Sequence, residues 1–229
     1  MEKLRKIFVP IVTLALLLTL ALYALGVFTD APMQVSGHAD PAGGEYSGEM
    51  RKGKYQGEGA LLLPNGDRYE GIFDDNIYSL RGRYTSVQNW EYSGELLDGK
   101  PNGRGTFTTK DGDAYEGEWL LGDISGAGEF RAKKGWRFVG TFQNGEFVEG
   151  KLTLKNGSYY EGKFVDGKPE DTEGLYIQMD DKGAMRWNYT GGFKAGLFEG
   201  KGLMVESGGE AADTRTHGTW TAGVLTKKD

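Results

Sequence analysis

The stretch YEGEWLLGDISGAGEF, residues 115–130, combines an aromatic-x-Gly-x-aromatic phrase with a Gly-x-Gly run, and the first phrase recurs through most of the chain. Its glycine returns after 23 residues four times, and then after 22, 29 and 27 residues, at Gly48, Gly71, Gly94, Gly117, Gly140, Gly162, Gly191 and Gly218. A fixed period in the twenties is the mark of a repeat array. The sequence therefore predicts an extended object whose units contact mainly their neighbours.

Each repeat reads as a β-hairpin. Large and small side chains alternate in Tyr115–Trp119 and again in Gly126–Phe130, as they do in strands. Asn-Gly and Asp-Gly pairs, which supply the positive φ angles of tight hairpin turns, recur at 65–66, 98–99, 111–112, 144–145, 156–157 and 166–167. The predicted fold is all-β, an elongated single-layer antiparallel sheet of successive β-hairpins.

The period aligns three columns of apolar side chains. The first column holds Tyr46, Tyr69, Tyr92, Tyr115, Phe138, Tyr160 and Tyr189. The second holds Met50, Phe73, Leu96, Trp119, Phe142, Phe164, Phe193 and Trp220, and the third holds Leu61, Tyr84, Phe107, Phe130, Leu152, Tyr176 and Leu203. The first two columns share a face because their positions are four residues apart on one strand. The glycine between them leaves a gap that we expect rings of neighbouring repeats to fill.

The N-terminal region predicts a membrane segment. Residues 7–28 form a run of 22 residues without charge, which as a helix reaches about 33 Å and so crosses a hydrocarbon core of about 30 Å. Basic residues precede it, which favours a cytoplasmic N-terminus and an extracytoplasmic array, periplasmic or extracellular. A signal anchor over residues 1–28 is favoured because the apolar run is long for a signal peptide. Cleavage near Ala24–Gly26 remains the alternative and would make the protein secreted.

The remaining boundaries follow from composition. Residues 29–45 are polar and contain Pro32 and Pro41, so we predict a flexible spacer. The array occupies residues 46–225 as seven repeats and a terminal half-repeat, and residues 226–229 form a tail. The sixth and seventh repeats carry insertions within 170–187 and 206–216.

Composition and charge exclude several functions. The formal charge is −6, and residues 1–29 are net positive, so the rest of the chain carries −8. An acidic array is a poor partner for nucleic acid or anionic lipid.

The chain has no cysteine and only His38 and His217, far apart, so we predict no nucleophilic triad, no metal site and no cofactor. Glu70, Glu116 and Glu161 alternate away from the rings, which places them on the solvated face. The protein is therefore predicted not to be an enzyme.

YEGEWLLGDISGAGEF and YSGELLDGKPNGRGTFTTKDGDAY resemble MORN repeats, and the resemblance covers about residues 46–225. It implies a twisted sheet of hairpins used mostly for protein contacts and in some members for membrane lipids.

We expect a non-enzymatic, membrane-anchored scaffold that binds a protein partner. The alternative is a lipid- or glycan-binding module that uses exposed aromatics of the same array. Open sheet edges also allow homo-oligomers. Large aromatics outside the columns or beside insertions are the expected partner-binding residues: Trp90, Trp136, Tyr159, Tyr176 and Trp187.

Overall fold

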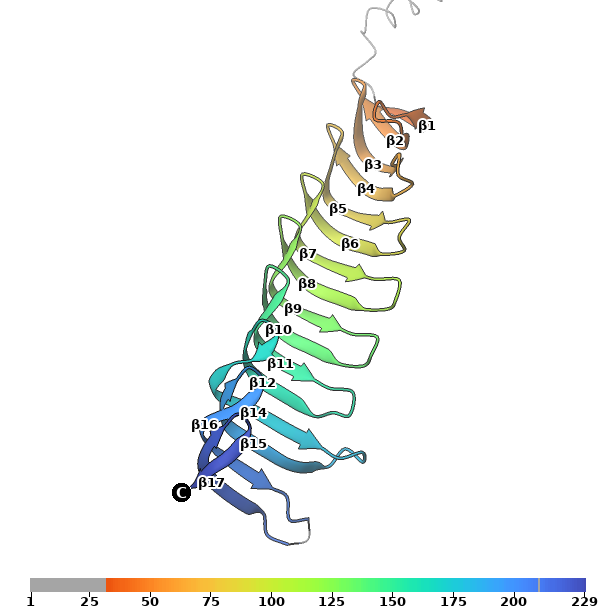
Figure 1. Cartoon of the computed structure of the whole chain (residues 1–229). Helices are drawn as coiled ribbons and strands as arrows, with labels where there is room; N and C mark the ends of the chain where they lie inside the picture. Colours follow the sequence, from red (N-terminus) through yellow and green to blue (C-terminus); the bar gives the residue numbers. More distant parts are fainter. Residues whose placement is uncertain (1–31, 210) are drawn as a thin grey trace, which may run out of the picture. The chain divides into compact units, whose positions relative to one another are not determined.

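The computed structural model describes residues 32–209 and 211–229 (Figure 1). The predicted anchor at residues 7–28 lies outside the described residues. Within the described ranges, no helix has the length and apolar character needed to span a bilayer. The chain divides into two compact parts, with the boundary between Tyr84 and Thr85.

The first part is an antiparallel sheet in which each strand pairs with the next. Its strands are β1 (Met33–Ala39), β2 (Glu45–Arg51), β3 (Lys54–Leu62), β4 (Arg68–Asp74) and β5 (Ile77–Thr85, whose last residue crosses the boundary). The predicted flexible spacer is wrong for residues 33–39, because β1 pairs with β2 from Met33–Met50 to Ala39–Glu45. Without β1, the polar backbone groups along this edge of β2 would have no partner strand. β1 carries none of the repeated phrases, so the period did not reveal it.

The second part continues the hairpin pattern with longer strands toward its end. Its strands are β6 (Glu91–Leu97), β7 (Lys100–Thr108), β8 (Ala114–Leu120), β9 (Asp123–Arg131), β10 (Arg137–Gln143), β11 (Glu146–Thr153), β12 (Tyr159–Val165), β13 (Lys168–Pro169), β14 (Asp171–Met179), β15 (Met185–Lys194), β16 (Leu197–Glu206), β17 (Thr214–Thr221) and β18 (Val224–Lys228). Neighbouring strands are antiparallel, and β12 pairs with both β13 and β14. The predicted tail at 226–229 belongs mostly to β18, which pairs with β17 as far as Gly218–Lys228.

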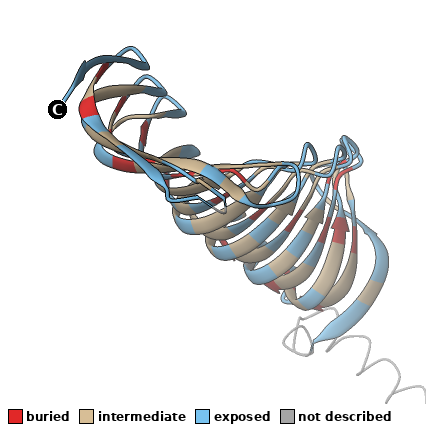
Figure 2. Cartoon of the chain, turned by 90° about the horizontal axis from the view of Figure 1, so that it is seen from below, coloured by how far each residue is buried: buried red, intermediate tan, exposed pale blue. Residues whose placement is uncertain are grey.

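A ring over a pair of glycines is the core motif of every repeat. The first-column residues are at most 3 % exposed, and buried positions alternate with exposed ones along the strands (Figure 2). In the fourth repeat, the Tyr115 hydroxyl donates to the carbonyl oxygen of Glu118 at 2.9 Å. This bond holds the ring over Gly117 and Gly128, where an added Cβ would come within 2.4 Å of the Tyr115 hydroxyl oxygen. The predicted gap-filling by neighbouring repeats is therefore wrong, because each ring covers the glycines of its own repeat.

Neighbouring repeats meet through the second column instead. In the second part, the second-column ring of one repeat packs edge-on against the first-column ring of the repeat before it, as Phe142 does on Tyr115 with 5.1 Å between ring centroids. The same T-shaped contact joins the pairs Tyr92–Trp119, Phe138–Phe164, Tyr160–Phe193 and Tyr189–Trp220. Edge-to-face pairs stabilise a core beyond the area that they bury.

One column assignment is wrong by one residue. Gly191 lies opposite Gly202 and Tyr189 opposite Met204, so Met204 takes the third-column position that the sequence assigned to Leu203. Leu203 lies on the other face, because a shift of one residue along a strand exchanges the faces. The regular offset of 15 residues between the first and third columns, as from Tyr115 to Phe130, fits Met204 and would have identified it.

Candidate functional site

A further column of side chains lies over the first and was missed in the sequence. Nine residues after each first-column position stand Tyr55, Tyr78, Pro101, Ile124, Phe147, Pro169 and Phe198. The Phe147 ring stacks on Phe138 with 4.2 Å between centroids, and the Phe198 ring stacks on Tyr189 at 4.0 Å. We call these residues the cover column. The same 23-residue period would have revealed it, since it places Tyr55, Tyr78 and Phe147 in one register.

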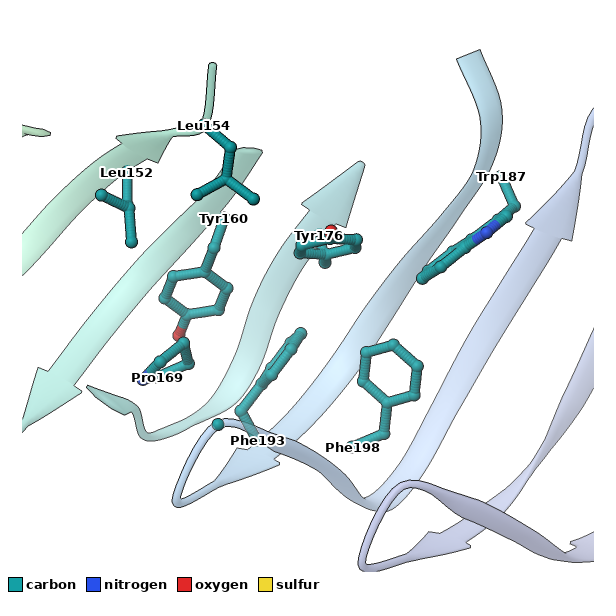
Figure 3. A pocket seen from close by; sticks show the side chains of 9 residues that line it. Leu152, Leu154, Tyr160, Pro169, Tyr176, Trp187, Phe193 and Phe198 are labelled. Carbon is teal, nitrogen blue, oxygen red and sulfur yellow. The ribbon is translucent and has the colours of Figure 1, made fainter. Parts of the chain in front are cut away.

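The cover column lacks a ring at Pro169, and a hollow opens beside it. The hollow has a volume of about 290 Å³. Its wall consists of Leu152, Leu154, Tyr160, Pro169, Tyr176, Trp187, Phe193, Gly196 and Phe198, contributed by β11 to β16 and the turns between them (Figure 3). Pro169 is smaller than the phenylalanines at the equivalent positions on either side, so the space above Tyr160 stays partly empty. We call this space the aromatic hollow.

The wall of the aromatic hollow is uncharged, and its tyrosine hydroxyls are already bonded. Tyr160 donates to the carbonyl oxygen of Lys163 at 3.0 Å, and Tyr176 donates to Gln178 Oε1 at 2.9 Å. Burial raises the pKa of Tyr160, and the nearby charges of Asp171 and Glu170 raise it further. The hollow therefore offers ring faces and aliphatic surface rather than acid–base groups, which suits an apolar or flat group of a ligand.

Two of the five predicted partner-binding residues, Tyr176 and Trp187, lie together in this wall. Their rings are 5.2 Å apart, and Trp187 also packs edge-on against Phe198. Both come from the lengthened β14–β15 hairpin, in which Gln178 pairs with Trp187 beyond the Tyr176–Tyr189 pair. Trp187 stands two residues before Tyr189, as Trp136 stands two residues before Phe138, so the Tyr176–Trp187 pair repeats the Phe130–Trp136 contact of a regular repeat.

The other three predicted residues lie elsewhere. Trp136 stacks on Phe130 with 5.0 Å between centroids, and Trp90 lies tilted against Phe107 at 5.7 Å. Both tryptophans are half-buried on the ring face, two residues before a first-column ring. Tyr159 is on the opposite face, beneath the Lys151 ammonium, which lies 3.5 Å from its ring centre. The structure therefore does not gather the five residues into one site.

A polar hollow of about 610 Å³ lies at the other ends of the same strands. Its carboxylates already accept bonds from backbone N–H groups. Asp171 accepts from Lys163, Thr172 and Glu173, while Glu170 and Glu199 each accept from one turn residue. Although burial opposes it, these N–H bonds together with Lys163 lower the pKa of Asp171. The carboxylates thus brace turns, and within the described ranges no cluster of three or more acidic, histidine or cysteine side chains is placed to hold a metal ion.

The remaining polar candidates lie apart. His38 is on β1 in the first part, and His217 is exposed on β17 in the second. Glu70, Glu116 and Glu161 are all exposed, and Glu116 and Glu161 lie opposite Glu129 and Lys151 on the face opposite the first-column rings. This confirms the predicted solvated position of the carboxylate row.

Solved structures with a similar course of the chain have low sequence identity. One is the TCP domain of SAS-4 (dCPAP) from Drosophila melanogaster in complex with a proline-rich motif of Ana2 (dSTIL), 14 % identical over 80 % of this chain and 88 % of that chain, with a TM-score of 0.27. Another is the TCP10 domain of Danio rerio CPAP in complex with a STIL peptide, 12 % identical over 82 % and 84 %, with a TM-score of 0.26. TM-scores this low support no functional argument. No curated protein sequence matches the chain.

The repeats themselves match a family model. The MORN repeat model matches residues 46–68, 92–114, 115–137, 138–159, 160–170 and 189–205. The matched segments leave out the second repeat, whose Gly-x-Gly run is altered, and the insertion of the sixth repeat. They cover more than half of the chain, and in their hairpins rings lie over glycine pairs, as Tyr69 also does in the second repeat. The chain therefore belongs to the MORN-repeat family.

Proposed function

We propose that this protein is a non-enzymatic, membrane-anchored scaffold that binds a partner protein through the ring face of its second part, with the aromatic hollow as the anchor point. MORN repeats support a role in protein interaction or membrane binding. The observation that favours a protein is the hollow itself. Its uncharged wall of five aromatic rings and its volume of about 290 Å³ fit one large apolar side chain of a partner.

The residues that line the aromatic hollow indicate which kind of side chain the partner inserts. Trp187, Tyr176 and Phe198 present ring faces and edges, and the two wall hydroxyls are already bonded within the chain. A charged group entering the hollow would lose its hydration without gaining a counter-charge. An aromatic or aliphatic side chain would bury apolar area at no such cost. The proposed partner therefore inserts an apolar side chain from an extended segment that lies along the ring face.

Site-specific photocrosslinking of the full-length protein in membranes tests this proposal. A photoreactive residue replaces Trp187 at the hollow, and the matched control carries it at Tyr159, on the opposite face. We expect one protein to crosslink at 187 and not at 159, and its mapped peptide to carry a large apolar side chain. A synthetic copy of that peptide should bind the wild-type protein and lose at least tenfold in affinity for Pro169→Phe, which fills the hollow. Equal crosslinking at both positions would contradict the proposal.

The same experiment separates the alternative. If vesicles of neutral lipid or a neutral glycan bind the protein and Pro169→Phe abolishes that binding with no protein crosslinked, the array is a lipid- or glycan-binding module. The formal charge of −8 outside residues 1–29 disfavours anionic lipid.

The anchored, extracytoplasmic topology is a separate part of the proposal and rests on the uncharged run at 7–28 behind basic residues. The chain has no cysteine, so a single Ser207→Cys places one thiol in the loop after β16. We expect a membrane-impermeant maleimide to label this thiol in intact cells, and the labelled protein to retain residues 1–28. Labelling only after lysis would overturn the topology, and a labelled, truncated protein in the medium would mean cleavage and secretion.

A further inference from the structure

The face opposite the rings changes character along the second part. One row of side chains runs across it through paired positions, with Glu116, Glu129, Val139, Lys151 and Glu161 on β8 to β12. The same row continues as Leu175, Thr190, Leu203 and His217 on β14 to β17. From β14 on, the row has no carboxylate or lysine, and two leucines alternate with Thr190 and His217.

The neighbouring row makes the same change. It holds Arg131 and Arg137 on β9 and β10, and then Tyr159, Ile177, Asn188, Val205 and Arg215 from β12 to β17. Leu175, Ile177, Leu203 and Val205 therefore form a patch on two strands on either side of β15, and all four are half-buried. We call this patch, with Asn188 and Thr190 between its halves, the back patch. The strong contacts of its strands run to neighbours in the same sheet, so no second layer packs on it among the described strands.

A β-sheet with apolar residues on both faces is typical of a layer inside a larger assembly. We propose that the back patch is covered by a second copy of this chain, in a two-fold dimer whose axis runs parallel to β15. This interface goes beyond the proposed function, because it uses the opposite face of the sheet.

The positions of the residues along the paired strands favour a second copy of this chain and an axis parallel to β15. A two-fold axis parallel to β15 keeps each row in place and exchanges β14 with β16 and β12 with β17. Leu175 then lies over Leu203 of the second copy, and Ile177 lies over Val205. Asn188 and Thr190 lie on the axis and meet their own copies. Apolar residues thus face apolar residues, and the two central polar residues face hydrogen-bonding groups, as an isologous interface requires.

The flanking charges are complementary under the same operation. Glu161 on β12 faces the exposed His217 of the second copy, whose ring N–H can donate a hydrogen bond to the carboxylate. One row further, Glu173 on β14 faces Lys201 on β16, and both side chains are exposed. An axis perpendicular to the strands would instead place each strand over its own copy, so that Glu173 on β14 could not face Lys201 on β16. Opposite charges across an interface fix its register, so the parallel axis is the favoured one.

Crosslinking of the full-length protein in detergent micelles tests the dimer. Asn188→Cys introduces the only thiol of the chain, directly on the proposed axis. Packed sheets lie about 10 Å apart, beyond disulfide reach, so a short bismaleimide is the probe. We expect Asn188→Cys to crosslink to a dimer at least tenfold more than Ser93→Cys, a matched control on the same face of β6. Adding Leu175→Asp and Ile177→Asp should remove that crosslink.

Charge reversal at residues outside the apolar back patch is a second, independent test of the dimer. Glu173→Lys and Lys201→Glu, each alone, should lower the dimer fraction in sedimentation equilibrium at least threefold, and the double variant should restore it. Both residues are exposed, so all three variants should keep the wild-type β-sheet circular dichroism spectrum. A protein that is monomeric at every concentration, or a dimer that crosslinks through Lys228→Cys at the β18 edge and not through Asn188→Cys, would overturn the proposal. Neither result bears on partner binding at the aromatic hollow.

Discussion

The regular repeats over residues 92–159 and the lengthened ones over 160–205 place the same ring over the same glycine pair. Tyr115 covers Gly117 and Gly128, and Tyr189 covers Gly191 and Gly202. They differ in what surrounds that motif. The regular repeats carry Pro101, Ile124 and Phe147 in the cover column and charged residues such as Glu129 and Lys151 on the opposite face. The lengthened repeat carries Pro169, between Phe147 and Phe198, in the cover column and Leu175 on its opposite face. The glycine pair fixes the register, so surrounding positions are free to change, and both proposed binding surfaces arise from such changes.

The shared motif predicts the largest effect. Gly128→Ala and Gly202→Ala should each destabilise the protein by about 3 kcal/mol, because the new methyl group displaces a buried tyrosine ring. The turn variant Gly145→Ala is the control, because its φ of 82° strains alanine while nothing lies within 4 Å. That strain costs about 1 kcal/mol. Denaturant unfolding measures all three. If Gly202→Ala cost no more than the control, the lengthened repeat would have a different core.

The cover column predicts the next effect. Phe147→Ala should cost about 2 kcal/mol, since it removes a ring stacked on Phe138 and in contact with Phe142 and Phe164. Pro169→Ala should cost less than about 1 kcal/mol, because the proline fills only part of its position. Thermal unfolding of both variants measures the difference. Equal losses would mean that Pro169 packs as tightly as a ring and that the hollow is not a structural gap.

The period predicted most of the fold. It located the first-column rings, the glycines and the hairpin turns, because each recurs in register and each has one physical role. It failed where the register is local. β1 has no repeated phrase. Leu203 was assigned the third-column position of Met204, because the one-residue shorter offset of the fifth repeat was applied where the regular 15-residue offset holds.

The candidate site was harder to predict because it is defined by a missing side chain. Tyr176 and Trp187 were selected as unusual aromatics, but they meet as Phe130 and Trp136 do in a regular repeat, and the space beside them depends on Pro169. Pro169 drew no attention, although its position nine residues after Tyr160 matches Phe147 nine residues after Phe138. The rows of the back patch depend in turn on pairing across five strands. A sequence gives the residues of such a row but not their alignment.

Alkaline pH should produce a smaller difference between single variants. Burial raises the pKa of Tyr92 and of Tyr115 from 10.0 to about 12. The unfolded chain therefore ionises first, so the stability contributed by these rings is complete below pH 10 and is lost as the pH rises toward 12. We expect the melting temperature to fall over this range, and to fall less steeply in Tyr115→Phe than in the wild type. Tyrosinate absorbance checks which state ionises. A slope unchanged by Tyr115→Phe would contradict the assignment.

The smallest effect concerns the one first-column ring in the second part that has no hydroxyl. Tyr92, Tyr115, Tyr160 and Tyr189 each donate to the carbonyl oxygen three residues later, but Phe138 has no hydroxyl with which to reach Thr141. Phe138→Tyr should therefore stabilise the protein by about 1 kcal/mol, and Tyr115→Phe should destabilise it by a similar amount. Denaturant unfolding at pH 7 measures both. The ring at 138 is sandwiched between its glycines and Phe147 at 4.2 Å, so a loss of stability in Phe138→Tyr would show that this repeat has no room for the hydroxyl. The fifth repeat, which borders the aromatic hollow through Leu152 and Leu154, would then already depart from the regular core before the insertion begins.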